Sequence, residues 1–372
     1  MHENEVLDIL ESEGIEYILT LPCDRTKELC ALISERFREV GLCREEDGIG
    51  ISAGLSLAGR RPVLHIQSSG LGNSLNAIMT LPFLYGLPLP VLASWRGVYR
   101  EKISAQIPFN SALPGVLDAL GLRYTIIEEA SEIPLIREVI RDAFEKTRPH
   151  IALISPKVWE GRDECQREER FPARSHEISL QHTGIFREPV MKRADAINII
   201  SEEITDELVV SNIGVPSKEL CAAGDRAANF YMLGSYTQAT PLGLGLALGS
   251  DKEVVVLDGD GSLLGTAVLP VVAALMPENL TIICLDNGAF GSTGNQMTPA
   301  WMGVDLELSA RAAGIQRTAK VHTPQELRRA WRDRKEGPVL IHVIIRPGNS
   351  AAPGIPLSAE EIKERFRMSS ES

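Results

Sequence analysis

Gly259-Asp260-Gly261-Ser262 directly follows a predicted strand of branched apolar residues, and Asn287 stands 27 positions after Asp260. Asn287 follows a second predicted strand, over residues 280–285, and precedes a glycine-rich run over 288–294. Glycine lets a backbone approach phosphate closely, and the start of a following helix offers free N–H groups to anionic oxygens. Mg²⁺ takes oxygen ligands, usually one or two carboxylates together with phosphates. The stretch therefore predicts a diphosphate site held through a divalent cation, although Gly-Asp-Gly alone is also typical of a plain tight turn.

The spacing, the second strand and the glycine-rich run favour the cation site, and together they resemble the diphosphate-binding motif of thiamine-diphosphate (ThDP) enzymes. That motif reads GDG and, twenty-odd residues later, asparagine. The resemblance implies that Mg²⁺ is bound by Asp260, by the side chain of Asn287 and by the main-chain carbonyl of Ala289. It also implies that the cofactor is contacted by Gly259, Asp260, Gly261, Ser262, Asn287, Ala289, Phe290 and Gly291.

The composition excludes several classes of protein. A chain of 372 residues is long enough for two domains of about 100–200 residues each. The net charge of −12 argues against nucleic acid as a partner, because binding to a phosphate backbone needs excess Lys and Arg. No apolar run approaches the ~20 residues that cross a bilayer, and residues 1–5 lack the basic start of a signal peptide, so we expect a cytoplasmic protein without a membrane partner. The six cysteines include no CxxC pair, which favours reduced thiols.

Predicted strands and helices alternate in two parts of the chain, residues 1–160 and 188–372. Such alternation with β-branched strands is typical of parallel sheets covered on both faces. We therefore predict an α/β fold with two doubly wound parallel-sheet domains, joined by a charged linker over 161–187. Among the predicted helices are those over 27–40, 74–84 and 358–366, the last with Ser358 as N-cap and Glu361 three residues later.

Three adjacent acids, Glu45, Glu46 and Asp47, open a segment of small residues that reaches Gly54. The segment resembles the glutamate-bearing helix of ThDP pyrimidine domains, in which the glutamate precedes an Ala-Gly pair by eight and nine residues. Glu45 stands nine residues before Gly54. The resemblance implies that Glu45 lies beside N1′ of the aminopyrimidine, where burial raises its pKa and lets it hold the shared proton. Glu46 and Asp47 are alternatives, and acids at a helix start are also typical of solvated residues that the helix dipole favours.

A further cofactor contact is expected at Gly234-Ser235-Tyr236, which precedes a helix of small residues. This segment resembles the element that bends ThDP into its V shape. The resemblance implies that the Gly234 carbonyl accepts a hydrogen bond from the 4′-amino group and that Tyr236 lies between the two rings. Related enzymes often carry methionine there, so tyrosine departs from the pattern.

The order of a pyrimidine (PYR) domain over 1–160, a linker, and a diphosphate (PP) domain over 188–372 leaves no room for the central domain of acetolactate synthases or pyruvate decarboxylases. Residues 67–76 and 94–97 resemble the phosphonopyruvate and sulfopyruvate decarboxylases, and this resemblance covers essentially the whole chain. Residues 21–25, 44–48 and 102–108 favour the sulfopyruvate group, in the form that joins its alpha and beta subunits. Phosphonopyruvate enzymes carry Pro-Asp-Ser and Asn-Glu-Gly at the first two of these places.

The resemblance implies a lyase that uses ThDP and Mg²⁺ to decarboxylate 3-sulfopyruvate to sulfoacetaldehyde and CO₂ in coenzyme M biosynthesis. A phosphonopyruvate decarboxylase and a non-catalytic binding protein of ThDP fold are the alternatives. In this family the partner domains come from different chains, so we expect a homodimer or homotetramer with active sites between chains. No histidine lies in a recognisable motif, and the acid that protonates the product is not identified.

An anionic 2-keto acid needs a locally basic pocket in an acidic protein. Arg96 follows a predicted strand, where the sites of α/β proteins gather, whereas Arg25 and Lys27 are as readily surface charges. Cys23 either contacts the substrate or packs as a small hydrophobe. The predicted substrate residues are Cys23, Ser68, Ser69, Gly70, Leu71, Arg96 and Lys102.

Overall fold

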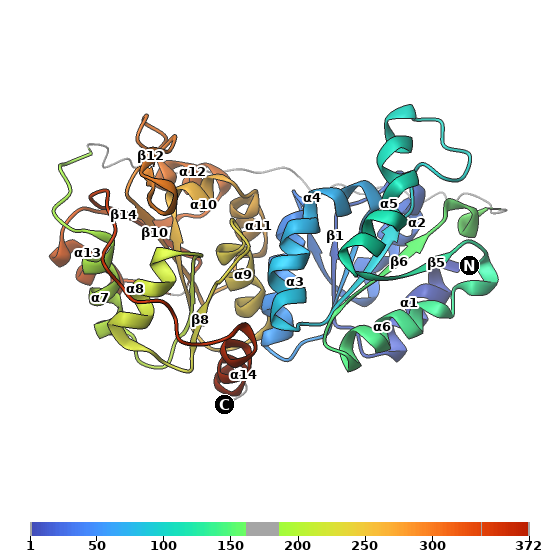
Figure 1. Ribbon diagram of the computed structural model, residues 1–372, viewed down its shortest axis with the longest axis horizontal. Coiled ribbons are helices and arrows are strands. Elements are labelled where there is room, and N and C mark those ends of the chain that lie inside the picture. Colours follow the sequence, from blue (N-terminus) through green and yellow to red (C-terminus); the bar gives the residue numbers. More distant parts are fainter. Residues whose placement is uncertain (1, 161–185, 336, 371–372) are drawn as a thin grey trace. The chain divides into compact units, whose positions relative to one another are not determined.

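The computed structural model describes residues 2–160, 186–335 and 337–370, and its contacts divide the chain into two units. Within the described residues, the first unit comprises 2–52 and 60–160, and the second comprises 53–59, 186–335 and 337–370. Each unit contains a six-stranded sheet with helices packed against it (Figure 1). The predicted α/β class with two parallel sheets is confirmed. The predicted linker lies outside the described residues except for 186 and 187.

The sheet of the first unit has the order β2-β1-β3-β4-β6-β5, and every neighbouring pair is parallel. The strands β2, β1, β3 and β4, after which the candidate site residues follow, are therefore neighbours. Ligands of open α/β sheets bind at the carboxyl ends of the strands. The strands are β1 (Tyr17–Thr20), β2 (Arg38–Gly41), β3 (Pro62–Gln67), β4 (Leu89–Ser94), β5 (Arg123–Ile127) and β6 (Pro149–Ile154). The α-helices are α1 (His2–Ser12), α2 (Lys27–Arg36), α3 (Glu45–Leu57), α4 (Ser68–Ile78), α5 (Ile107–Leu120) and α6 (Leu135–Glu145).

Helix α6 shows how sequence periodicity builds the core of this unit. Its buried residues Ile136, Val139, Ile140 and Ala143 recur at the spacing of one helical face. Ile136, Val139 and Ile140 join one apolar cluster with residues of α1 and of the sheet. Burying each large aliphatic side chain contributes about 1.5–3 kcal/mol, so this face fixes α6 on the sheet.

The sheet of the second unit has the order β13-β14-β10-β9-β7-β8, again with parallel neighbours. Because β9 and β10 are adjacent, the residues that follow them, Asp260 and Asn287, emerge at the same edge. The strands are β7 (Leu208–Ser211), β8 (Asn229–Tyr231), β9 (Val254–Gly259), β10 (Leu280–Asp286), β13 (Arg317–Val321) and β14 (Val339–Ile344), with a separate hairpin of β11 (Ala289–Phe290) and β12 (Gln296–Met297). The α-helices are α7 (Arg193–Glu203), α8 (Val215–Gly224), α9 (Ala239–Gly249), α10 (Asp260–Leu264), α11 (Val268–Leu275), α12 (Leu306–Ala313), α13 (Pro324–Arg332) and α14 (Ala359–Ser370).

The helix predicted over 27–40 was wrong at its end. Helix α2 stops at Arg36, Phe37 is extended, and residues 38–41 form the edge strand β2. Of this strand only Val40 is buried, because charged residues occupy the outer positions of an edge strand. Those charges gave 38–40 the appearance of one more helical turn.

The helix predicted over 74–84 begins earlier, since α4 starts at Ser68, and residues 79–83 form a π-helical turn. The predicted anion-binding residues 68–71 are thus the first turn of α4. At the other end of the chain the predicted cap is confirmed: Ser358 N–H donates to the Glu361 carboxylate at 2.7 Å, and Glu361 N–H donates to Ser358 Oγ at 3.2 Å. Among the described residues, no helix combines the length and apolarity needed to span a membrane.

Candidate active site

The turn between β9 and α10 holds a buried carboxylate. Asp260 is the first residue of α10 and is 2% exposed. Burial, and next the nearby charge of Asp286, raise the pKa of Asp260 to about 6. Two buried carboxylates at the end of adjacent strands form the kind of environment that a divalent cation stabilises.

The turn that follows β10 presents Asn287 at the same edge. Asp286 Oδ1 accepts a hydrogen bond from Gly288 N–H at 2.9 Å, and Gly288 has a φ of 62°, which favours glycine. Asn287 Oδ1 accepts from Ala289 N–H at 3.2 Å, and its buried Nδ2 has no hydrogen-bond partner. Among the described residues, the oxygen of this carboxamide therefore has a hydrogen-bond partner and its Nδ2 group has none.

A threonine that no sequence motif singles out joins these two turns. Thr298 is fully buried after β12, its Oγ1 donates to Asp260 Oδ2, and its N–H donates to the Gly288 carbonyl at 2.9 Å. The hairpin of β11 and β12 brings it there. The two turns are also closely packed, because a Cβ on Gly261 of the first turn would lie 2.5 Å from the Phe290 ring of the second.

These residues fit a metal-bound diphosphate. The donor set consists of hard oxygen atoms, which Mg²⁺ prefers, and two of the predicted ligands, Asp260 and Asn287, lie on one edge of one sheet. The buried Asn287 Nδ2 has no partner among the described residues, and the Asp260 carboxylate is buried, so a bound diphosphate and its cation would satisfy both groups. Ser262 lies buried in the same short helix, and Gly291 follows the hairpin strand β11.

The segment that precedes α9 is held in an uncommon backbone conformation. Ser235 and Thr237 have positive φ values of 61° and 75°. Such strain in non-glycine residues persists where the surroundings enforce it, often at ligand sites. Tyr236 lies between these two residues in the sequence. Its side-chain Oη donates to the Gly261 carbonyl at 2.6 Å. The segment predicted to bend the cofactor is thus tied to the Gly-Asp-Gly turn.

In the first unit, Glu45 lies against the start of α4. A Cβ on Gly70 would be 2.7 Å from both Cδ and Oε1 of Glu45. No hydrogen bond or ion pair joins the Glu45 carboxylate to another described residue. Glu46 instead pairs with Arg44 at 2.7 Å, and Asp47 is fully buried inside α3. Of the three acids, Glu45 has the carboxylate that is free to meet a ligand.

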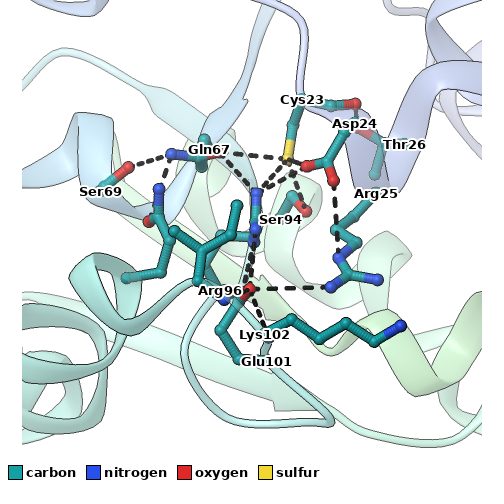
Figure 2. Close-up of polar contacts among 12 residues, drawn as sticks. Cys23, Asp24, Arg25, Thr26, Gln67, Ser69, Ser94, Arg96, Glu101 and Lys102 are labelled. Carbon is teal, nitrogen blue, oxygen red and sulfur yellow. Dashed lines mark hydrogen bonds and ion pairs between the residues drawn. The ribbon is translucent and has the colours of Figure 1, made fainter.

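The carboxyl ends of β1, β3 and β4 bring predicted substrate residues together (Figure 2). Cys23 is buried, and its thiol sulfur lies within hydrogen-bond distance of Gln67 Oε1 and of Ser94 Oγ, both at 3.4 Å. Gln67 Nε2 donates to Ser69 Oγ. The main-chain N–H of Arg96 donates to Ser68 Oγ at 3.0 Å. Gln67 thus connects the Cys23 loop to the first turn of α4, although only its segment, and not the residue itself, was selected from the sequence.

Arg96 is the buried cation of this cluster, and its charge is already compensated. Nε and Nη2 donate to the two oxygens of Glu101 at 2.7 and 3.0 Å, and Nη1 donates to Asp24 Oδ1 at 2.6 Å. The hydrogen-bonded Arg96 guanidinium lowers the pKa of Glu101, whereas burial raises it. The guanidinium has the larger effect, so the pKa of Glu101 falls to about 2. Lys102 is exposed, and Figure 2 shows its ammonium group pointing away from the cluster.

Gly70 and Leu71 are buried in the first turn of α4, and their role as N–H donors to the substrate stays a prediction. His65 lies inside β3 with its pKa lowered to about 4 by burial, so it is neutral near pH 7. Asp24, Gln67, Glu101 and Thr298 are polar residues of the two sites that were not selected as site residues from the sequence. Asp24 and Gln67 lie in segments that resemble the family, 21–25 and 67–76, whereas Glu101 and Thr298 lie in no such segment and reach their sites through loops.

Models of two domain families match this chain. Residues 3–121 match the N-terminal TPP binding domain of thiamine pyrophosphate enzymes, and residues 220–343 match their C-terminal TPP binding domain. The chain belongs to the thiamine pyrophosphate enzyme family. Thiamine pyrophosphate is another name for ThDP, so the family that the sequence resembles is confirmed.

Three relatives in this thiamine pyrophosphate enzyme family are similar over long stretches. Sulfopyruvate decarboxylase of Methanosarcina acetivorans is 50% identical over 98% of this chain and 96% of its own length. The beta subunit of sulfopyruvate decarboxylase from Methanothermobacter thermautotrophicus is 43% identical over 48% of this chain and 94% of the subunit. Phosphonopyruvate decarboxylase of Streptomyces hygroscopicus is 32% identical over 98% of this chain and 92% of its length. A separate subunit thus corresponds to half of this chain, as expected of a fused form.

Proposed function

We propose that this chain catalyses the ThDP-dependent decarboxylation of 3-sulfopyruvate to sulfoacetaldehyde and CO₂, as a carbon–carbon lyase of coenzyme M biosynthesis. The observation that carries the proposal is the similarity along the whole chain to a relative named sulfopyruvate decarboxylase. The phosphonopyruvate decarboxylase is less similar over the same length. Both predicted halves of a cofactor site are present in the chain, which supports catalysis over simple binding.

The proposed cofactor site uses residues of both units. Asp260, Asn287 and the Ala289 carbonyl would hold Mg²⁺ and, through it, the diphosphate. Gly234 and Tyr236 would contact the ring system, and Glu45 would hold and release a proton at N1′ of the aminopyrimidine. When bound, ThDP supplies the electron sink that accepts the electron pair left by CO₂.

The substrate carries two negative charges, whereas Arg96 already has two acidic partners. These partners differ: Glu101 is buried and binds Arg96 through two hydrogen bonds, but the Asp24 side chain is 62% exposed. A sulfonate can therefore replace Asp24 on Arg96 Nη1 while Glu101 stays in place. Ser69 and the N–H groups at the start of α4 would bind the second anionic group, with Cys23 packed beside Gln67.

The division of the site and the family resemblance, in which partner domains come from different chains, support an oligomer. Glu45 belongs to the first unit and Asp260 to the second. We infer a homodimer or homotetramer in which each active site takes these residues from different chains, with residues 1–160 and 188–372 as PYR and PP domains, 161–187 as linker, and the cytoplasm as location. Sedimentation of a fully active monomer would contradict the assembly.

The proposed reaction is tested by measuring CO₂ release from sulfopyruvate, phosphonopyruvate and pyruvate with ThDP and Mg²⁺. We expect kcat/KM to be highest for sulfopyruvate. A preference for phosphonopyruvate would transfer the assignment to the second candidate, which the same anionic pocket and the Streptomyces relative support. Binding of ThDP without turnover of any of the three would point to a non-catalytic protein.

A further inference from the structure

Buried polar side chains continue behind the Asn287 turn, and the proposed reaction gives them no role. They begin at Asp286, which ends β10. One carboxylate oxygen, Oδ1, accepts the Gly288 N–H that shapes the turn. The other, Oδ2, lies 2.7 Å from His342 Nε2. Both side chains are buried, with His342 fully so, and therefore this contact replaces water on both groups.

His342 reaches Asp286 from the neighbouring strand. It lies on β14 opposite Cys284, and residues two apart on a strand face the same side, so His342 and Asp286 share one face of the sheet. Its other ring nitrogen, Nδ1, lies 3.6 Å from Asp305 Oδ1. The imidazole is thus enclosed between two carboxylates.

Asp305, on the other side of His342 from Asp286, is also held in place. Asp305 caps α12 by accepting N–H groups of Glu307 at 3.0 Å and Leu308 at 3.2 Å, and it is ion-paired with Lys320. The Phe186 ring packs edge-on against His342, with 6.3 Å between centroids. With a carboxylate on each side and a ring against its face, the imidazole has one orientation in which Nε2 meets Asp286.

We propose that His342 is a positioning residue for the divalent cation of the proposed ThDP site. By donating from Nε2 to Asp286 Oδ2, it holds this carboxylate so that Oδ1 accepts the Gly288 N–H. That hydrogen bond sets the turn that presents Asn287 and the Ala289 carbonyl to the cation. Groups that orient metal ligands in this way affect metal affinity without touching the metal. The inference rests on the proposed cation site. It goes beyond that site because it assigns a supporting role to a residue of the neighbouring strand β14.

The test compares variants of the full chain with ThDP present and Mn²⁺ as the probe, with free Mn²⁺ measured by electron paramagnetic resonance. His342→Leu removes the donor, and we expect the Kd for Mn²⁺ to rise on the order of 10-fold or more. His342→Gln keeps an N–H group that reaches Asp286, and we expect a Kd within about threefold of wild type, since the hydrogen bond is restored. His150→Leu is the matched control, because His150 is also a buried strand histidine, 2.9 Å from the carboxylate of Asp142, but lies in the first unit. It should leave the Kd unchanged.

The outcomes separate the two proposals. Wild type that binds no Mn²⁺ with ThDP refutes the cation site itself. Wild-type binding together with unchanged binding by His342→Leu overturns the role of His342, and so does a glutamine variant as weak as the leucine variant. Where circular dichroism shows that His342→Leu does not fold, Asp305→Asn decides, because it loosens the imidazole from its other side. A several-fold rise in Kd then supports the proposal, and an unchanged Kd overturns it.

Discussion

Replacing Glu101 by glutamine removes the negative charge that holds buried Arg96. The pKa of Glu101 falls from an ordinary 4.5 to about 2 in the folded protein, chiefly through the Arg96 guanidinium and against the effect of burial. At about 1.4 kcal/mol per pKa unit this difference corresponds to about 3.5 kcal/mol at pH 7, within the about 3–5 kcal/mol typical of breaking a buried pair. The first unfolding transition of Glu101→Gln should therefore shift down by roughly 7–14 °C.

The sign of the pH dependence follows from the lowered pKa. The stabilisation by Glu101 is fully present above pH 4.5 and is lost as the pH falls through about 2, so wild type and Glu101→Gln should converge in that window. Thermal unfolding followed by circular dichroism between pH 7 and 2 measures this. The matched control is Glu160→Gln, since Glu160 pairs with Arg100 at 2.8 Å on the surface and should contribute under about 1 kcal/mol. A loss at pH 7 no larger than that of the control, or a difference that stays constant down to pH 2, would refute the reasoning.

Three substitutions test the cofactor residues. Glu45→Gln should keep ThDP binding, followed by fluorescence quenching, but abolish turnover, and activity within a few-fold of wild type would mean that another acid activates the cofactor. Gly70→Ala places a methyl group against the Glu45 carboxylate, so kcat should fall about 100-fold or more, whereas Gly115→Ala, whose Cβ meets nothing within 4 Å, should leave kcat unchanged. Thr298→Val removes the hydrogen bond to Asp260, a loss of about 1.5–3 kcal/mol that should raise the Mg²⁺ concentration for half-maximal activity at least several-fold, and an unchanged Mg²⁺ titration would show that Thr298 does not support the metal site.

The parts of the fold that the sequence predicts well are those where one local pattern decides the outcome. The central strands are continuously apolar, and the Gly-Asp-Gly turn and Asn287 follow two of them directly. Adjacent parallel strands then bring Asp260 and Asn287 to one edge without further information. The edge strand β2 was missed for the opposite reason, because its charged residues carry no strand periodicity and its pairing with β1 decides its conformation.

The remaining site residues depend on where loops return to the sheet. Arg96 was correctly placed at the end of a strand, but its pairing with Glu101 and Asp24 depends on the path of the loop after β4 and on the turn after β1. Thr298 reaches Asp260 only because the hairpin of β11 and β12 reverses the chain. No spacing rule links such residues to the motif they support. Sequence alone therefore identifies the groups proposed to contact the cofactor more readily than the groups that hold them in place.

The contact between Glu45 and Gly70 limits how this enzyme can be redesigned. The loop and helix start at 67–76 are the proposed place to alter substrate preference, since they carry the proposed substrate residues Ser69 and Leu71. Position 70 is closed to that use, because any side chain there would occupy the space of the Glu45 carboxylate. A library that varies 69 and 71 and keeps glycine at 70 should retain cofactor activation, whereas one that randomises all three would consist mostly of inactive proteins. The absence of a side chain at position 70 thus separates the residues proposed to set specificity from the residue proposed to activate the cofactor.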